Sequence, residues 1–198
     1  MKKRKKKLPN SHSSRTAKRR AARARKTQRL NFEALEKRQL LATFSVSTHV
    51  DELFDGGTLA EETNDGDGLS LREAIGLANT DSAMDLVEFD VSLSGSTITL
   101  ASPRMTISED LTIDGDIDND GLADITIDGA QSTAVTRQHF EITAGTTTLD
   151  GLNLTRGRGR GSNNGGIDVR AGATLNFTNS QLVDGFSFSG VSGIDNAG

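Results

Sequence analysis

The densest group of side chains able to do chemistry is an acidic stretch over residues 116–124. It places Asp116, Asp118, Asp120 and Asp124 around Gly121. Carboxylates at alternate positions followed by a glycine are typical of calcium loops, because the glycine permits a sharp bend and the side chains then converge on one ion. Four carboxylates held so close would repel one another without a cation. The spacing therefore predicts that these four aspartates bind calcium.

The acidic stretch is not a complete EF-hand loop. Its twelfth position is Ile127, where an EF-hand needs a bidentate glutamate. We therefore expect a shorter loop whose remaining ligands are backbone carbonyls or water. The alternative is a solvent-exposed acidic turn, since Asp-Gly and Asn-Asp pairs favour turns without any ion.

Other reactive side chains are sparse. The chain has no cysteine, which excludes disulfides, thiolate metal sites and a cysteine nucleophile. The histidines His12, His49 and His139 are scattered, and no serine lies in a nucleophile motif. The sequence thus predicts no catalytic residues and no cofactor besides calcium.

Charge divides the chain into two unlike parts. Residues 1–38 hold 16 of the 23 basic residues and two acids, a net charge of +14, whereas the remainder has seven arginines, no lysine and 25 acids, a net charge of −18. The basic arm is expected to be a disordered leader, because its apolar content is low. It lacks the apolar stretch of a conventional signal peptide. The acidic remainder argues against specific nucleic-acid binding.

One segment carries a clear helix signal. Ser70 and Glu73 have the spacing of a capping box, which predicts a helix over residues 71–79. Leu71, Ile75 and Ala78 recur on one face of that helix. A helix this short needs a surface to pack on.

The rest of the chain has the pattern of short strands. Apolar residues recur in pairs two apart, bounded by turn residues, which is typical of strands with one buried face. These pairs are Ile98/Leu100, Met105/Ile107, Leu111/Ile113, Ile125/Ile127, Phe140/Ile142, Leu152/Leu154, Ile167/Val169 and Leu175/Phe177. Segment 111–115 resembles segment 125–129, and segment 148–151 loosely resembles segment 174–177. Such repeats favour a parallel β-helix, with a β-sandwich as the alternative.

Two short motifs resemble those of known bacterial surface proteins. Residues 35–42, Leu-Glu-Lys-Arg-Gln-Leu-Leu-Ala, are similar to an L-E-P-R-x-L-L-A element that follows a basic arm in many exported proteins, with Lys37 in place of the proline. Residues 69–75, Leu-Ser-Leu-Arg-Glu-Ala-Ile, with the preceding Asp-Gly turns and the later segment 87–90, resemble the C-S-L-R-E-A-I region of surface proteins. That family's cysteine is Leu69 here, which favours apolar packing at this position.

The resemblance to the C-S-L-R-E-A-I family implies an architecture. We expect a right-handed, pectin-lyase-like parallel β-helix with repeats like those of polymorphic outer-membrane proteins. The helix would cap one end, with Arg72 and Glu73 in capping and surface roles. The domains would be a leader with an export element over residues 1–43, a cap region over 44–96, and β-helix coils over 97–198 that are incomplete at the C-terminus.

The sequence therefore predicts a non-catalytic scaffold or adhesin, exported to the bacterial surface or the extracellular medium. Its partner would be an extracellular polysaccharide or protein. No apolar run approaches the ~20 residues of a membrane-spanning helix. One alternative is a polysaccharide lyase or hydrolase of the same fold, for which Asp150, Asp168 and Asp184 would have to line one face. Another is a polyanion-binding module that acts through the basic arm and Arg156–Arg160, a segment otherwise expected to be a flexible exposed loop.

Overall fold

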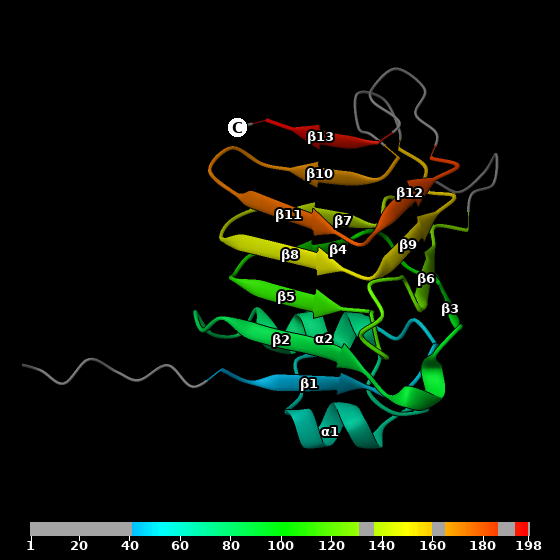
Figure 1. Ribbon diagram of the computed structural model, residues 1–198. Coiled ribbons are helices and arrows are strands. Elements are labelled where there is room, and N and C mark those ends of the chain that lie inside the picture. Colours follow the sequence, from blue (N-terminus) through cyan, green and yellow to red (C-terminus); the bar gives the residue numbers. More distant parts are fainter. Residues whose placement is uncertain (1–40, 131–136, 160–164, 186–192, 198) are drawn as a thin grey trace, which may run out of the picture. The chain divides into compact units, whose positions relative to one another are not determined.

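The computed structural model describes residues 41–130, 137–159, 165–185 and 193–197 (Figure 1). The described residues all belong to one compact unit. The basic arm and most of the export-type element therefore lie outside them.

The described strands form three sheets. The first sheet has the order β1 (Thr43–Val46), β2 (Asp85–Phe89), β5 (Leu111–Asp114), β8 (Thr146–Asp150) and β11 (Thr174–Thr178). The second has the order β3 (Thr97–Thr99), β6 (Ile125–Asp128), β9 (Leu152–Thr155) and β12 (Gln181–Val183). The third has the order β4 (Met105–Ile107), β7 (Phe140–Ile142), β10 (Ile167–Val169) and β13 (Ile194–Asn196).

All pairings among these strands are parallel. From β2 onward the chain runs through one strand of each sheet in turn before it returns to the first sheet (Figure 1). Neighbouring strands of a sheet are therefore far apart in sequence; Asn176, for example, lies 28 residues after its register partner Thr148. The all-β prediction is confirmed. The β-sandwich alternative is wrong, because such sandwiches are built from antiparallel sheets.

The apolar pairs predicted from the sequence form the core. Seven of the eight pairs are buried, and they pack with Phe44, Val46, Val87 and Leu149 into one cluster. The eighth pair, Leu175 and Phe177, is only half-buried because β11 is the last described strand of its sheet. Burial of alternate residues explains why such short strands are stable together.

The internal repeats have a different meaning from the one predicted. Segments 111–115 and 125–129 form β5 and β6, which lie in different sheets. What they share is a glycine at a corner: a Cβ on Gly115 would lie 2.6 Å from the Gly151 carbonyl oxygen, and a Cβ on Gly129 would lie 2.6 Å from that of Arg156. The loose resemblance between segments 148–151 and 174–177 aligns Leu149 with Leu175. In the structure the register partner of Leu149 is Phe177, so the predicted alignment differs from the true register by two residues.

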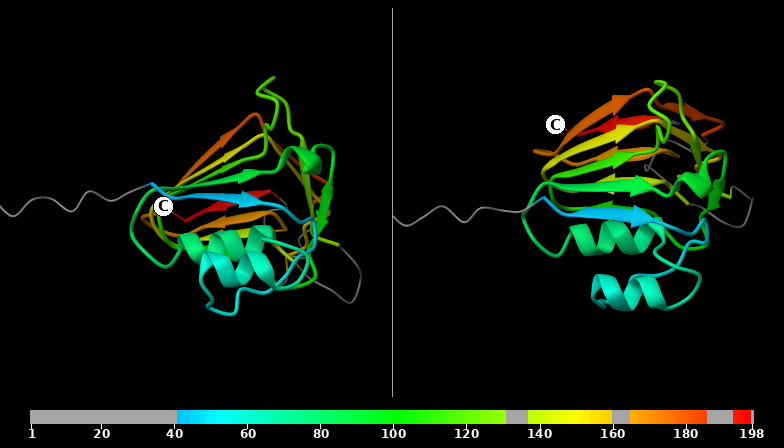
Figure 2. Two further views of the ribbon diagram at one scale, coloured as in Figure 1. Left: turned by 90° about the horizontal axis from the view of Figure 1, so that it is seen from below. Right: turned by 60° about the horizontal axis from the view of Figure 1, so that its bottom comes forward.

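Two helices lie at the β1 end of the first sheet, where Figure 2 shows them one above the other. Helix α2 (Leu71–Ala78) confirms the predicted helix and contacts β1, β2 and β4. Its N-terminus has the predicted capping box: Ser70 N–H donates to Glu73 Oε2 at 2.8 Å, and Glu73 N–H donates to Ser70 Oγ at 3.3 Å. Leu69 is buried against the same core, as predicted. A short 3₁₀ helix, η1, spans Val91–Leu93.

Helix α1 (Leu59–Asn64) was not predicted. It begins after Thr58, whose N–H donates to Glu61 Oε2 at 2.8 Å. Thr58 and Glu61 have the same spacing as Ser70 and Glu73, so the sequence carried the signal. It was missed because the six residues of α1 show no apolar stripe. Segment 44–96 thus contributes both helices, β2, and all of β1 except Thr43.

We expect the capping box of α2 to make a measurable contribution to the free energy of unfolding. Ser70→Ala removes an N-cap hydroxyl at a buried helix start and should lower the free energy of unfolding by about 0.5–2 kcal/mol. Chemical denaturation measures this loss. Ser92→Ala, at an exposed position in η1, is the control; a loss no larger than that of the control would contradict the capping role.

Candidate functional site

The acidic loop predicted to bind calcium connects β5 to β6. Asp116, Asp118 and Asp120 each offer an oxygen, and these atoms lie within 4.8 Å of one another. Asp116 is nearly buried, and its carboxylate accepts the N–H groups of Asp120 at 3.0 Å and Gly121 at 2.9 Å. The structure thus brings three of the four predicted ligands together.

The fourth predicted ligand, Asp124, has a different place. Its Oδ2 accepts the N–H of Ile117 at 2.9 Å, and its Oδ1 accepts the hydroxyl of Ser94 at 3.2 Å. Asp124 is not part of the three-carboxylate group. Its hydrogen bond to Ile117 joins the end of the loop to its beginning. An acidic turn that binds no ion would be stabilised by the same kind of hydrogen bond.

Calcium binding by this loop stays a prediction. Calorimetric titration of the full chain with calcium chloride should give a heat that Asp118→Ala reduces, because Asp118 is exposed and contributes one of the three converging carboxylates. Glu88→Ala, an exposed acid in β2, is the matched control. Equal heats for the parent chain and Asp118→Ala would contradict binding by the loop.

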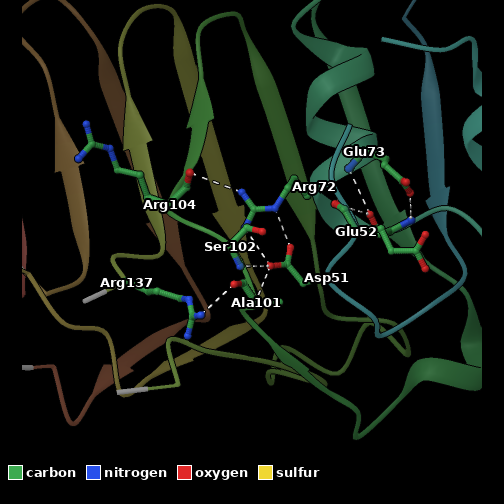
Figure 3. A network of polar contacts seen from close by, with 9 residues as sticks. Asp51, Glu52, Arg72, Glu73, Ala101, Ser102, Arg104 and Arg137 are labelled. Atoms are coloured by element: carbon green, nitrogen blue, oxygen red, sulfur yellow. Dashed lines mark hydrogen bonds and ion pairs between the residues drawn. The ribbon is translucent and has the colours of Figure 1, made fainter. Parts of the chain in front are cut away.

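A second polar group connects α2 to the turn between β3 and β4 (Figure 3). The side chain of Asp51 is only 1% exposed. It accepts Arg72 Nε at 2.7 Å and Nη2 at 3.0 Å, and also the N–H groups of Ala101 at 2.7 Å and Ser102 at 3.0 Å. This network was not predicted, because Asp51 and Arg72 are separated by a loop and α1.

The predicted surface roles of Arg72 and Glu73 are therefore wrong in part. Glu73 does cap α2, but it is 1% exposed. Arg72 is largely buried by its pairing with Asp51. Both residues hold the helical end of the domain together instead of facing solvent.

A third group lies on the outer side of the third sheet. Glu141 accepts Arg104 Nε at 2.7 Å and Arg170 Nε at 2.9 Å, and Arg170 also pairs with Asp168 at 3.2 Å. Burial acts to raise the pKa of Glu141, but the hydrogen bonds from Arg170 and Arg104 outweigh it and hold the pKa below its usual value. A carboxylate kept ionised between two arginines is poorly suited to general acid catalysis.

The acids proposed for a lyase or hydrolase do not meet. Asp150 lies in β8 of the first sheet, Asp168 in β10 of the third, and Asp184 just after β12 of the second. Asp150 is engaged by Thr178 Oγ1 and Asn179 Nδ2, each at 2.9 Å. The prediction that these three acids could line one face is wrong.

The arginine-rich segment is exposed only in part, whereas an exposed loop was expected. Arg156 pairs with Asp128 and donates from Nε at 2.8 Å. Arg158 is 7% exposed, and its N–H donates to the Arg137 carbonyl at 2.7 Å. Arg160 lies outside the described residues. Gly157, Arg158 and Gly159 are buried, whereas Arg156 is exposed.

A buried histidine lies at the corner before β7. His139 Nε2 is 2.9 Å from the Thr155 carbonyl oxygen, which can only accept, so Nε2 carries the proton of a neutral ring. Burial lowers the pKa of His139, although Thr155, Ile127 and Asp128 act in the opposite direction. His139 is thus held uncharged inside the fold.

This histidine predicts how stability depends on pH. The pKa of His139 is lower in the folded chain than in the unfolded chain. As the pH falls below about 6.5, His139 is therefore protonated more readily in the unfolded chain than in the folded chain. We expect the free energy of unfolding to fall by up to about 1.4 kcal/mol per pH unit as the pH decreases below about 6.5. His139→Gln should flatten that slope, and exposed His49→Gln should not. A slope unchanged in His139→Gln would contradict this origin.

Comparison with other proteins gives no relatives. No family model matches the chain, and no curated protein and no solved structure matches it. None of the described helices is long and apolar enough to cross a membrane.

Proposed function

We propose that this chain is an exported bacterial surface protein whose folded part forms a right-handed, pectin-lyase-like parallel β-helix and acts as a non-catalytic scaffold or adhesin. The observation that carries the proposal is the rotation of the chain through three parallel sheets around one apolar core. Each passage through the three sheets corresponds to one coil, and equivalent apolar side chains stack from coil to coil. Right-handedness follows the strong preference of parallel crossover connections.

Helix α2 supports the same proposal. A stack of coils leaves an open edge of strands at its end, and uncovered edges favour aggregation. Helix α2 packs on β1, β2 and β4, so it lies where a cap of the first coil would lie. This matches the role implied by the similarity of residues 69–75 to the C-S-L-R-E-A-I motif.

The ion pairs and hydrogen bonds of the acidic residues favour a scaffold over an enzyme. Glu141 and Asp128 are paired with arginines, and Asp150 is engaged by neutral side chains. The acids proposed for catalysis lie on different sheets. We propose an extracellular polysaccharide or protein as the partner, because the basic arm and export-type element favour surface display.

Binding without turnover is the test. The full chain should bind to extracellular polysaccharide or to a surface protein in a pull-down, and incubation with acidic polysaccharides should release no new chain ends. Clear depolymerisation would overturn the scaffold in favour of the enzyme. Salt-sensitive retention on heparin that survives removal of residues 1–38 would overturn it in favour of a polyanion-binding module.

A further inference from the structure

A buried glutamate lies in α1 with no positive charge to balance it. Glu62 is fully buried, and its Oε1 accepts the N–H of Gly57 at 2.7 Å. Its Oε2 has no hydrogen-bond partner among the described residues. Within the same part of the chain, no basic side chain forms an ion pair with Glu62. An ionised carboxylate here would exchange its hydration for a single hydrogen bond, which is unfavourable.

A neighbouring acid makes ionisation of Glu62 less favourable still. Asp55, in the loop before α1, accepts the same Gly57 N–H at 3.2 Å through its Oδ1. One N–H therefore serves two carboxyl groups, and the side chains of Asp55 and Glu62 lie within hydrogen-bonding reach of each other. Two carboxylates cannot bond to each other, because both can only accept. A proton on Glu62 turns that carboxyl group into a donor and Asp55 into its acceptor.

The contact between Glu62 and the loop depends on a glycine. A Cβ on Gly57 would lie 2.5 Å from Glu62 Oε1. Because glycine has no side chain, the loop backbone can approach the carboxyl group directly. The protonation state of Glu62 therefore bears on how the loop is held against α1.

The charged groups that act on Glu62 from outside α1 are both acids. Burial raises the pKa of Glu62, the hydrogen bond from Gly57 lowers it, and Asp55 and Glu73 raise it again. Asp55 acts from the loop, and Glu73 acts from the first turn of α2. Glu61, beside Glu62 in α1, is exposed and caps the start of its own helix. The neutral form of Glu62 is thus favoured by every element that faces it.

We propose that Glu62 and Asp55 share one proton, and that this proton holds the loop against α1 as a pH-sensitive latch at the helical end of the domain. The latch is independent of the proposed scaffold role. Asp55 is exposed, so the proton can exchange with solvent.

The direction of the pH dependence follows from the raised pKa of Glu62. A carboxyl group whose pKa is higher in the folded chain than in the unfolded chain contributes its full stabilisation below the unfolded pKa, about 4.3 for glutamate. That stabilisation is lost as the pH rises through the folded pKa. The latch therefore closes in acid and opens in base, opposite in sign to the effect of His139.

The experiment follows the proton in the full chain by NMR. The side-chain carboxyl carbon of Glu62 should titrate above the pH of about 4.3 that is typical of glutamate. Hydrogen exchange at the Gly57 N–H, measured relative to the unfolded chain at each pH, should lose protection by up to ~10-fold per pH unit as Glu62 ionises. Glu62→Gln should keep that protection at high pH, because its amide can still donate to Asp55. Glu88→Gln, at an exposed position in β2, is the matched control and should behave like the parent chain.

Asp55→Asn tests the sharing of the proton at an exposed position, and it serves if Glu62→Gln does not fold. In this variant Glu62 should titrate at a lower pH than in the parent chain, because the neighbouring negative charge is gone. Three results would overturn the latch. The first is a Glu62 carboxyl group that titrates at or below the typical pH, and the second is an unshifted titration in Asp55→Asn. The third is a loss of Gly57 protection with rising pH that is the same in Glu62→Gln as in the parent chain.

Discussion

Replacing Asp51 by alanine is expected to lower the free energy of unfolding by about 3–5 kcal/mol, the usual cost of breaking a buried ion pair. Its carboxylate accepts two hydrogen bonds from Arg72 and two from the backbone of residues 101 and 102. The substitution would leave a largely buried guanidinium without its counter-charge and two N–H groups without an acceptor. Equilibrium unfolding in urea measures the loss.

Two further variants distinguish the loss of this network from the general effect of removing a negative charge. Glu88→Ala removes an exposed acid and should change stability by no more than about 0.5 kcal/mol. Asp51→Asn/Arg72→Met removes both charges and should recover part of the loss, since a pair replaced by neutral groups leaves no charge buried alone. A loss below about 1 kcal/mol for Asp51→Ala would contradict the role of Asp51 as the link between α2 and the β3–β4 turn.

The second large effect is expected in the core. Phe140→Ala should lower the free energy of unfolding by about 3–5 kcal/mol, because Phe140 is fully buried and the cavity cannot collapse between two neighbouring strands. Calorimetric or denaturant unfolding measures this change. Phe177→Ala is the matched control, since Phe177 lies in the last described strand of its sheet and is half-buried. Equal losses at the two positions would mean that the core does not end at β11.

Period-two patterns predicted the strands well. Inward residues such as Ile107 and Ile142 are apolar and their neighbours are polar, so the pattern reflects burial directly. The α2 helix was equally predictable, because the capping box and the apolar stripe agree. Register was harder to predict: Leu149 and Leu175 look equivalent in sequence, yet Phe177 is the partner of Leu149. Register depends on how long each intervening loop is, and local sequence does not report that.

Polar sites could be predicted only where the residues are close in sequence. Asp116, Asp118 and Asp120 come together because one short loop holds them. Glu52, Asp65 and Glu73 come together only when α1 and α2 have packed, so their spacing in the sequence does not predict the group. The burial of Arg158 was missed for a similar reason: glycines beside an arginine suggested a flexible loop, whereas here they permit close packing.

The central claim is that strands from successive passages through the sheets stack in register, and the absence of cysteine makes it directly testable. Thr112, Thr148 and Asn176 are register partners on adjacent strands β5, β8 and β11. Adjacent strands lie about 4.8 Å apart, within disulfide reach, whereas next-but-one strands lie about twice as far apart.

The decisive measurement is disulfide formation under mild oxidation in three double-cysteine variants of the full chain. Thr112→Cys/Thr148→Cys and Thr148→Cys/Asn176→Cys should form an intramolecular disulfide. Thr112→Cys/Asn176→Cys should remain reduced, because β8 lies between the two positions. A disulfide in the last variant, or none in the first two, would contradict the stacked arrangement.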